Sequence, residues 1–235
     1  MARVTLPRGD EKRAAVESMF DRLAPRYDRV NRVISLGLDQ GWRRATLATL
    51  GLAPGSLVLD LACGTGDLCR ALTRGGHRAV GIDLSAGMLE AANCDAPLVR
   101  ADTLALPARA GSVDGVVCGF ALRNFVALDP FFTECARVVR PGGRVVALDA
   151  SEPTGTVARL GHAVWFRRVV PWIGGRLSGD AAAYRYLPAS TAYLPDGTGL
   201  VEMIQRAGFT DVRRTTRTAG AVQIMSGTRE GDVAT

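Results

Sequence analysis

The spacing of apolar residues divides the chain into three regions. Between residues 11 and 50, apolar positions recur at helical spacing and are interrupted at Pro25 and Gly37, which predicts two or three short helices. From residue 55 to 150, short β-branched runs alternate with helical segments. This alternation predicts a parallel sheet, because each parallel crossover requires a helix. In that region we expect strands at 57–61, 78–82, 98–101, 113–119 and 144–150, and helices at 67–73, 86–92 and 128–139.

The C-terminal region is less regular. An arginine- and tryptophan-bearing stretch at 156–178 is followed by a polar segment, predicted to be a loop, that ends near Asp196. The remaining elements that we expect are a helix at 197–207 and strands at 209–216 and 221–227, which could pair antiparallel at the edge of the same sheet.

Together these elements predict an α/β fold with a mostly parallel, seven-stranded sheet, helices on both faces and an antiparallel edge strand near the C-terminus. We expect a helical cap at residues 1–50 and a core domain at residues 51–228, with a helical lid inserted at about 152–195. Residues 229–235 are expected to form a flexible tail.

Composition and charge exclude several classes of protein. The 235 residues are 47% hydrophobic and 22% charged, which is typical of a globular domain. No run approaches the ~18 to 20 apolar residues of a membrane-spanning helix, and the polar start carries no signal segment, so we expect a cytoplasmic protein. The net charge is +6, but the basic residues are spread along the chain and only Lys12 is a lysine, which disfavours nucleic-acid binding.

The cysteines point to neither disulfides nor a metal site. There are five, an odd number, and they form no CxxC pair and lie mostly in apolar runs. We expect reduced, buried thiols and no bound metal.

The segment at 58–67 is the most informative. A buried strand runs into the turn Gly64-Thr65-Gly66 and then into a helix, so that backbone N–H groups can approach a ligand. Cys69 stands where the dinucleotide fingerprint has its third glycine, which disfavours NAD. A tight turn without a ligand is the structural alternative.

Two acids follow neighbouring strands. Asp83 ends the second strand and could accept hydrogen bonds from both hydroxyls of a ribose, and Asp102 follows the third and could accept from the amine of an adenine. An acid at a strand end is often only a helix cap. Three such features at successive strand ends favour a nucleoside site, because open parallel sheets bind ligands at that edge.

These motifs resemble the class I S-adenosylmethionine-dependent methyltransferases, which have a Rossmann-like fold, and more narrowly the ubiquinone/menaquinone biosynthesis C-methyltransferases. The broader likeness rests on 59–67, 81–83 and Arg140-Pro141-Gly142-Gly143-Arg144, and the closer one on Phe20, 27–31, 35–42, 119–124, 183–190, 195–196 and 207–209. The resemblance implies S-adenosylmethionine as cofactor, bound by Gly64, Thr65, Gly66, Asp83, Leu84, Asp102, Thr103 and Gly119. It also implies a prenylated quinol that is methylated at a ring carbon.

The chemistry sets modest demands on the protein. Methyl transfer from a sulfonium is an in-line displacement, which needs positioning and exclusion of water but no nucleophilic residue. A quinol carbon becomes strongly nucleophilic when a neighbouring hydroxyl is ionised, so a cation or donor near that oxygen would help.

Four residues are candidates for the catalytic site. Arg123, with Asn124, is expected to stabilise the phenolate, and Tyr27 and Tyr184 to position the substrate. Arg123 could instead bind a loop carbonyl, and the tyrosines could be core residues. Neither His77 nor His162 is expected to be catalytic.

Two departures from the family pattern leave the acceptor open. The family usually carries a histidine in the last strand, and 222–227 contains none; Phe120-Ala121-Leu122 replaces the commoner Phe-Gly-Leu. Demethylmenaquinol is the leading acceptor, and a phenolic, quinone or polyketide secondary metabolite is the alternative. A cofactor-binding protein without activity is a third hypothesis.

The stretch 156–178 interleaves Trp165, Phe166, Trp172 and Ile173 with arginines. It could lie on an anionic membrane surface, form a lid, or form the face of a homodimer.

Overall fold

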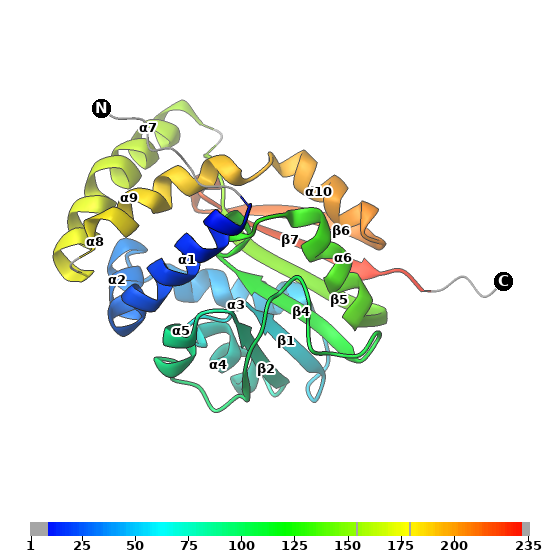
Figure 1. Ribbon diagram of the computed structural model, residues 1–235. Coiled ribbons are helices and arrows are strands. Elements are labelled where there is room, and N and C mark those ends of the chain that lie inside the picture. The colour runs from blue at the N-terminus through cyan, green and yellow to red at the C-terminus, as the bar shows by residue number, and fades with distance from the viewer. Residues whose placement is uncertain (1–8, 154, 179, 232–235) are drawn as a thin grey trace.

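The computed structural model describes residues 9–153, 155–178 and 180–231 and contains one seven-stranded sheet (Figure 1). The strands are β1 Leu57–Leu61, β2 Arg78–Asp83, β3 Leu98–Arg100, β4 Val113–Gly119, β5 Val139–Ala150, β6 Phe209–Arg217 and β7 Val222–Arg229. Their order is β3-β2-β1-β4-β5-β7-β6, and β7 runs antiparallel to both of its neighbours. The predicted fold class is therefore confirmed.

Alternate residues of the central strands pack on opposite faces of the sheet. Val58 and Val117 belong to a core cluster with residues of α3 and α4, whereas Leu59 and Val116 pack with residues of α6 and α10. The helices concerned are α3 Asp39–Leu50, α4 Asp67–Arg74, α6 Leu128–Val138 and α10 Gly197–Arg206, with α5 Ala86–Glu90 following β2. Because both faces are covered, the parallel strands are apolar along most of their length.

The chain before the sheet forms helices that break at the two predicted positions. α1 Gly9–Leu23 passes through a 3₁₀ turn at Ala24–Arg26, which contains Pro25, into α2 Tyr27–Ile34. Leu36 and Gly37 then adopt φ values of 53° and 76°, which ends α2 before α3 begins. α1 and α2 lie across the carboxyl ends of the first strands rather than on a face of the sheet (Figure 1).

The segment between β5 and α10 corrects one prediction. Residues 156–178 form a continuous helical run, α7 Thr156–Val164, a π-helical turn Trp165–Val169 and α8 Val170–Ser178. α9 Ala181–Ser190 follows where the sequence predicted a polar loop. Asp180 caps α9 by accepting a hydrogen bond from the backbone N–H of Ala183, and the helix buries Ala183 and Tyr184 against α1, α2 and α8. The prediction of a loop overlooked this alanine-rich helix, which tertiary packing stabilises.

None of the helices within the described residues is both long and apolar enough to cross a membrane. The predicted flexible tail was 229–235; Arg229 instead ends β7 and pairs with Phe209, and residues 232–235 lie outside the described residues.

Candidate active site

The glycine turn after β1 brings bare backbone to the carboxyl edge of the sheet. Gly64 and Gly66 have φ values of 55° and 81°, which glycine adopts at little cost. A Cβ on Gly66 would lie 2.6 Å from the Sγ of Cys94, so this position also lacks space for a side chain. The backbone N–H of Gly64 donates to the carboxylate of Asp83 at 2.7 Å, which joins the ends of β1 and β2.

Asp83 is held in one orientation by these backbone contacts. Its second carboxylate oxygen accepts from the N–H of Ser85 at 2.9 Å, and only 8% of the residue is exposed. Burial raises the pKa of the Asp83 carboxyl, and the backbone hydrogen bonds act in the opposite direction. Each oxygen of a carboxylate has a further lone-pair site, so Asp83 can still accept hydrogen bonds from a ligand.

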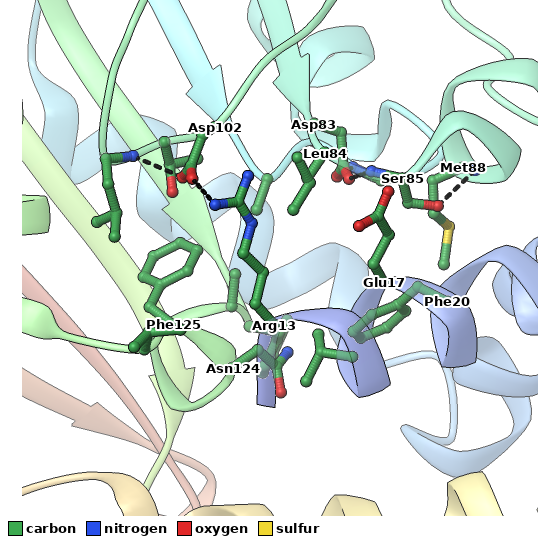
Figure 2. A pocket seen from close by; sticks show the side chains of 18 of the residues that line it. Arg13, Glu17, Phe20, Asp83, Leu84, Ser85, Met88, Asp102, Asn124 and Phe125 are labelled. Carbon is green, nitrogen blue, oxygen red and sulfur yellow. Dashed lines mark hydrogen bonds and ion pairs between the residues drawn. The ribbon is translucent and has the colours of Figure 1, made fainter. Parts of the chain in front are cut away.

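Most of the predicted cofactor residues line one cavity. It has a volume of about 190 Å³ and lies at the carboxyl ends of the first strands (Figure 2). The predicted residues that line it are Gly64, Asp83, Leu84, Asp102, Thr103 and Gly119. Two others are not among the residues that line it: Thr65 is buried and donates its hydroxyl to Asp28, and Gly66 packs on Cys94. We call this space the cofactor cavity.

The roof of the cofactor cavity is α1, the first helix of the predicted cap, whose contacts with this cavity the sequence did not indicate. Arg13 pairs with Asp102 at 3.0 Å, and Glu17 lines the cavity beside it (Figure 2). Asp21 accepts from the hydroxyl of Ser85 at 2.6 Å. Arg13, Glu17 and Asp21 stand four residues apart and so share one helix face. That spacing is visible in the sequence, but it does not reveal which partners the face meets.

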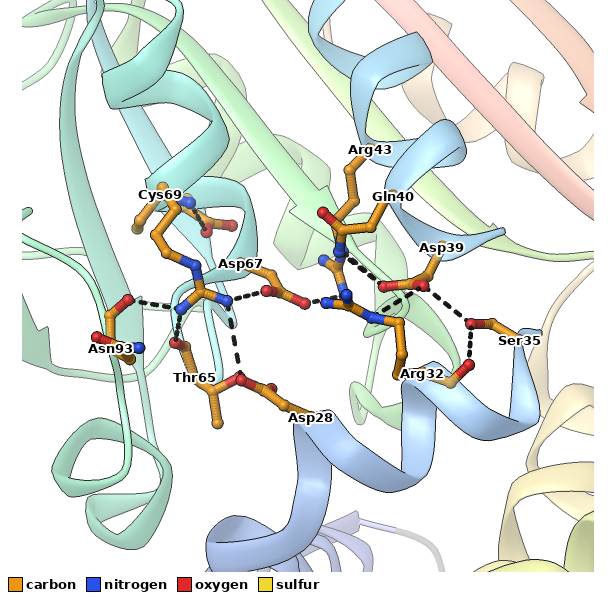
Figure 3. A network of polar contacts seen from close by, with 12 residues as sticks. Asp28, Arg32, Ser35, Asp39, Gln40, Arg43, Thr65, Asp67, Cys69 and Asn93 are labelled. Atoms are coloured by element: carbon orange, nitrogen blue, oxygen red, sulfur yellow. Dashed lines mark hydrogen bonds and ion pairs between the residues drawn. The ribbon is translucent and has the colours of Figure 1, made fainter. Parts of the chain in front are cut away.

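An ion-pair network connects α2 and α3 to the glycine turn (Figure 3). Arg43 of α3 pairs with Asp67, the first residue of α4, at 2.9 Å, and Arg70 also pairs with Asp67. Asp28 of α2 accepts the Thr65 hydroxyl. These contacts are half-buried or buried, so they hold the N-terminal helices in a defined position over the turn.

A second, more apolar cavity adjoins the first. Its volume is about 390 Å³, and Tyr27 and Phe120 line both spaces. The indole of Trp42 packs against Phe120 with ring centroids 5.9 Å apart, and Trp165 donates its indole N–H to the carbonyl of Ile34 at 3.2 Å. We call this space the acceptor cavity. It is lined by α2, α3, the turn between them and the helical run 156–178.

Arg123 lies in the wall of the acceptor cavity and is 8% exposed. Its Nη1 donates to the carboxylate of Asp149, which is fully buried near the end of β5 and also accepts from the N–H of Ala150 at 2.7 Å. The partner of Arg123 is thus a carboxylate, not the loop carbonyl that was the alternative. Within the described residues the other guanidinium nitrogens have no protein acceptor, so they remain available to a ligand.

The Tyr27 phenol lies between the two cavities, near charges of both signs. Burial raises its pKa and so does the charge of Asp28, while a hydrogen bond from Asn31 and the positive charges of Arg123 and Arg43 act in the opposite direction. A second phenol in the acceptor cavity would lie near the same two guanidinium groups. Their charge favours its ionised form.

Comparison with known proteins identifies the family. The model of the ubiE/COQ5 methyltransferase family matches residues 8–229. This chain belongs to that family. A ubiquinone/menaquinone biosynthesis C-methyltransferase of Syntrophotalea carbinolica is 39% identical over 90% of this chain and 92% of its own length. A demethylmenaquinone methyltransferase of Roseiflexus castenholzii is 38% identical over 96% and 98%.

A solved structure supports the fold. Magnesium protoporphyrin IX methyltransferase of Synechocystis with bound SAH has a TM-score of 0.63 and 19% identity, over 93% of this chain and 100% of that chain. As a member of the ubiE/COQ5 family, the protein is an S-adenosylmethionine-dependent methyltransferase. The predicted family, enzyme class and cofactor are confirmed.

The remaining candidates of this ubiE/COQ5 protein are dispersed. Asn124 lines the cofactor cavity, and among the described residues its buried Oδ1 has no hydrogen-bond partner. Tyr184 is 1% exposed and packs on Gly174, and it is absent from the walls of both cavities. His77 lies directly before β2, at the end of that strand opposite to the cofactor cavity. The side chains of His162, Phe166 and Arg167 lie outside the described residues.

Proposed function

We propose that this protein transfers a methyl group to a ring carbon of a prenylated quinol, with demethylmenaquinol as its acceptor. The observation that carries the proposal is the large apolar acceptor cavity, which meets the cofactor cavity at Tyr27 and Phe120 and has the Arg123 guanidinium in its wall. The two relatives described above, a ubiquinone/menaquinone biosynthesis C-methyltransferase and a demethylmenaquinone methyltransferase, support an acceptor of this class.

The cofactor cavity has the groups that S-adenosylmethionine needs. Asp83 would accept from its ribose, and Asp102 and Thr103 would flank its adenine. Gly64 and Gly119 leave room for it, and the Oδ1 of Asn124, which has no partner within the described residues, offers a further polar contact. Bound there, S-adenosylmethionine supplies an electrophilic methyl group on a positively charged sulfur.

The residues of the acceptor cavity would activate and orient the quinol. Arg123 would stabilise the phenolate of the ring, because it lines the cavity and Asp149 fixes its orientation. Tyr27, which lines both cavities, would hold the ring against the cofactor. Tyr184 has a different place in the proposal: it supports the lid by packing between α8 and α9, rather than contacting the substrate.

Water would be excluded by the helices before the sheet and by those inserted between β5 and β6. α1 covers the cofactor cavity through Arg13 and Asp21, and residues of 156–178 cover the acceptor cavity through Trp165 and Val170. We propose that residues 1–50 act as a cap and 152–195 as a lid on a core domain at 51–228. A dry cavity strengthens the interaction between a phenolate and Arg123.

The decisive experiment is methyl transfer from S-adenosylmethionine to a panel of quinols, read by mass spectrometry of the products. We expect a short-chain demethylmenaquinol to gain one methyl group on a ring carbon. A simple phenol and a polyketide phenol serve as competing acceptors. Turnover confined to one of these would replace demethylmenaquinol with a secondary metabolite, and binding of the cofactor without turnover of any acceptor would refute the proposal.

A further inference from the structure

The exposed apolar side chains gather at one end of the molecule. Within the described residues nine large hydrophobic side chains are exposed, and seven of them belong to α2, the turn after it, α7 or α8. They are Val33, Leu36, Leu38, Leu160, Val164, Trp172 and Leu177. These segments lie together at the end of the molecule away from β6 (Figure 1), and α2 packs on α8. An exposed concentration of this kind is typical of an interaction surface.

The run 156–178 presents a single stripe to the outside. Leu160, Val164, Arg168, Trp172 and Arg176 follow one another at intervals of four residues, and all five are exposed. Residues four apart lie on the same side of a helix. The guanidinium of Arg176 lies 5.3 Å from the ring centroid of Trp172, so the charge sits directly beside the largest exposed apolar group.

The charge of this stripe is of one sign. Residues 156–178 contain four arginines and no aspartate or glutamate. Within the described residues, the exposed arginines Arg159, Arg168 and Arg176 form no ion pair, so no acid of the chain neutralises their charge. Unpaired arginines among exposed tryptophan and leucine are the pattern of a helix that lies in the headgroup region of an anionic bilayer.

The stripe borders the mouth of the acceptor cavity. Leu36 and Leu38 are exposed and also line that cavity, and Gly161 and Trp165 line it from the helical run. A molecule with a lipid tail could therefore pass between these residues without crossing water.

We propose that this face, made of the α2–α3 turn and the outer side of residues 156–178, docks on an anionic lipid bilayer. The consequence that a lipid-tailed acceptor enters the acceptor cavity from the bilayer rests on the proposed function. A second copy of this chain fits the face less well, because a symmetric dimer would set the unpaired arginines against one another with no acid in the run to oppose them.

Sedimentation of the full chain with vesicles tests the docking. We expect binding to vesicles of phosphatidylcholine with about one-third phosphatidylglycerol, and far less to phosphatidylcholine alone. Arg168→Gln should lower the partition coefficient about fivefold, and the pair Leu160→Glu with Trp172→Glu at least tenfold. None of these residues lines the cofactor cavity or the acceptor cavity. Arg74→Gln and Val99→Glu, at exposed sites on α4 and β3, are the matched controls and should bind as the wild type does.

Recovery of the wild type in the supernatant at every lipid composition would overturn the docking. So would equal binding of the Leu160→Glu/Trp172→Glu variant, or a solution dimer that this variant dissociates while no vesicle binding is seen. As a folding control, the Leu160→Glu/Trp172→Glu variant must have the melting temperature of the wild type by circular dichroism. If its melting temperature is lower, the test rests on the Arg168→Gln variant alone.

A parallel assay separates the docking from the proposed function. With a short-chain, water-soluble quinol the variant should turn over at the wild-type rate, and with a long-chain quinol embedded in anionic vesicles it should be at least tenfold slower. If the wild type binds vesicles but methylates neither quinol, the proposed acceptor is wrong and the docking stands. If it methylates both quinols equally well but does not bind vesicles, the docking is wrong and the proposed function stands.

Discussion

Replacing Arg123 by alanine should damage both stability and catalysis, for two separable reasons. The substitution leaves the carboxylate of Asp149, which has no exposed surface, without its cation. Breaking a buried ion pair in this way typically costs about 3–5 kcal/mol of the free energy of unfolding. Because Asp149 keeps the N–H of Ala150 at 2.7 Å, we expect a value near the lower end, about 3 kcal/mol.

The catalytic loss should exceed what the stability change explains. Removing one preorganised donor at a developing negative charge typically lowers kcat by about 10²–10³-fold. The affinity for S-adenosylmethionine should stay within about twofold, because Arg123 lines the acceptor cavity and does not line the cofactor cavity. The measurements are urea unfolding, cofactor calorimetry and initial rates with a soluble quinol at a temperature at which every variant is folded.

The double variant Arg123→Ala/Asp149→Asn is the matched control. Neutralising Asp149 removes the unpaired charge, so the double variant should regain at least half of the lost stability but none of the lost rate. Recovery of the rate together with the stability would show that Arg123 acts only by neutralising Asp149, and the phenolate role would be lost. A loss of stability below about 1 kcal/mol in the single variant would contradict the reasoning about the buried pair.

Three further substitutions test other parts of the site. Asp83→Asn replaces one acceptor oxygen by a donor, and a hydrogen bond to a charged group contributes about 1.5–3 kcal/mol. The Kd for S-adenosylmethionine, measured by calorimetry, should therefore rise by about 10–100-fold, and an unchanged Kd would remove Asp83 from the ribose site. Burial raises the pKa of Asp60 from 3.8 to about 7, so the folded state holds this proton more tightly and stability falls as the pH rises from about 4 to 7. Asp60→Asn should therefore be more stable than the wild type by on the order of 2–4 kcal/mol at pH 8 and equal to it near pH 4. Thermal melts in which the stability difference between the two proteins does not change with pH would contradict the raised pKa of Asp60. A methyl group on Gly87 would lie 3.0 Å from the Cα of Asp21, so Gly87→Ala should displace α1 and weaken cofactor binding several-fold; Gly41→Ala, with no atom within 4 Å, should bind as the wild type does.

The sheet and its ligand-binding edge could be predicted because local signals specify them. Apolar β-branched runs bounded by glycine located β1 and β4 at their observed limits. Asp83 and Asp102 line the cofactor cavity because a strand that ends in an acid brings that acid to the carboxyl edge of a parallel sheet. The same rule applies to Asp149, the last residue but one of the predicted strand 144–150, and applying it would have indicated a partner for Arg123.

The sequence predicts a helical cap and a helical lid but not their contacts, because these contacts join segments that are distant in the sequence. Lys12 stands in a polar stretch of sequence typical of an exposed helix, yet it is 3% exposed and donates to the carbonyls of Arg123 and Phe125 at 3.0 and 2.6 Å. Burial lowers the pKa of its ammonium to about 8. Similarly, α9 is stabilised by burying Tyr184 under Gly174, a contact between two helices that the sequence pattern does not encode.

Lys12 also connects the roof of the cofactor cavity to a residue in the wall of the acceptor cavity. The two carbonyls that it binds flank Asn124, which lines the cofactor cavity, and one of them belongs to Arg123, which lines the acceptor cavity. α1 is held down by Arg13 on Asp102 and by Asp21 on Ser85, both at the cofactor cavity. A ligand that strengthens those contacts therefore stabilises the backbone around Arg123, and by linkage an acceptor that orders Arg123 favours closure of α1. The two substrates should thus promote each other's binding through α1, without any contact between Arg123 and the cofactor.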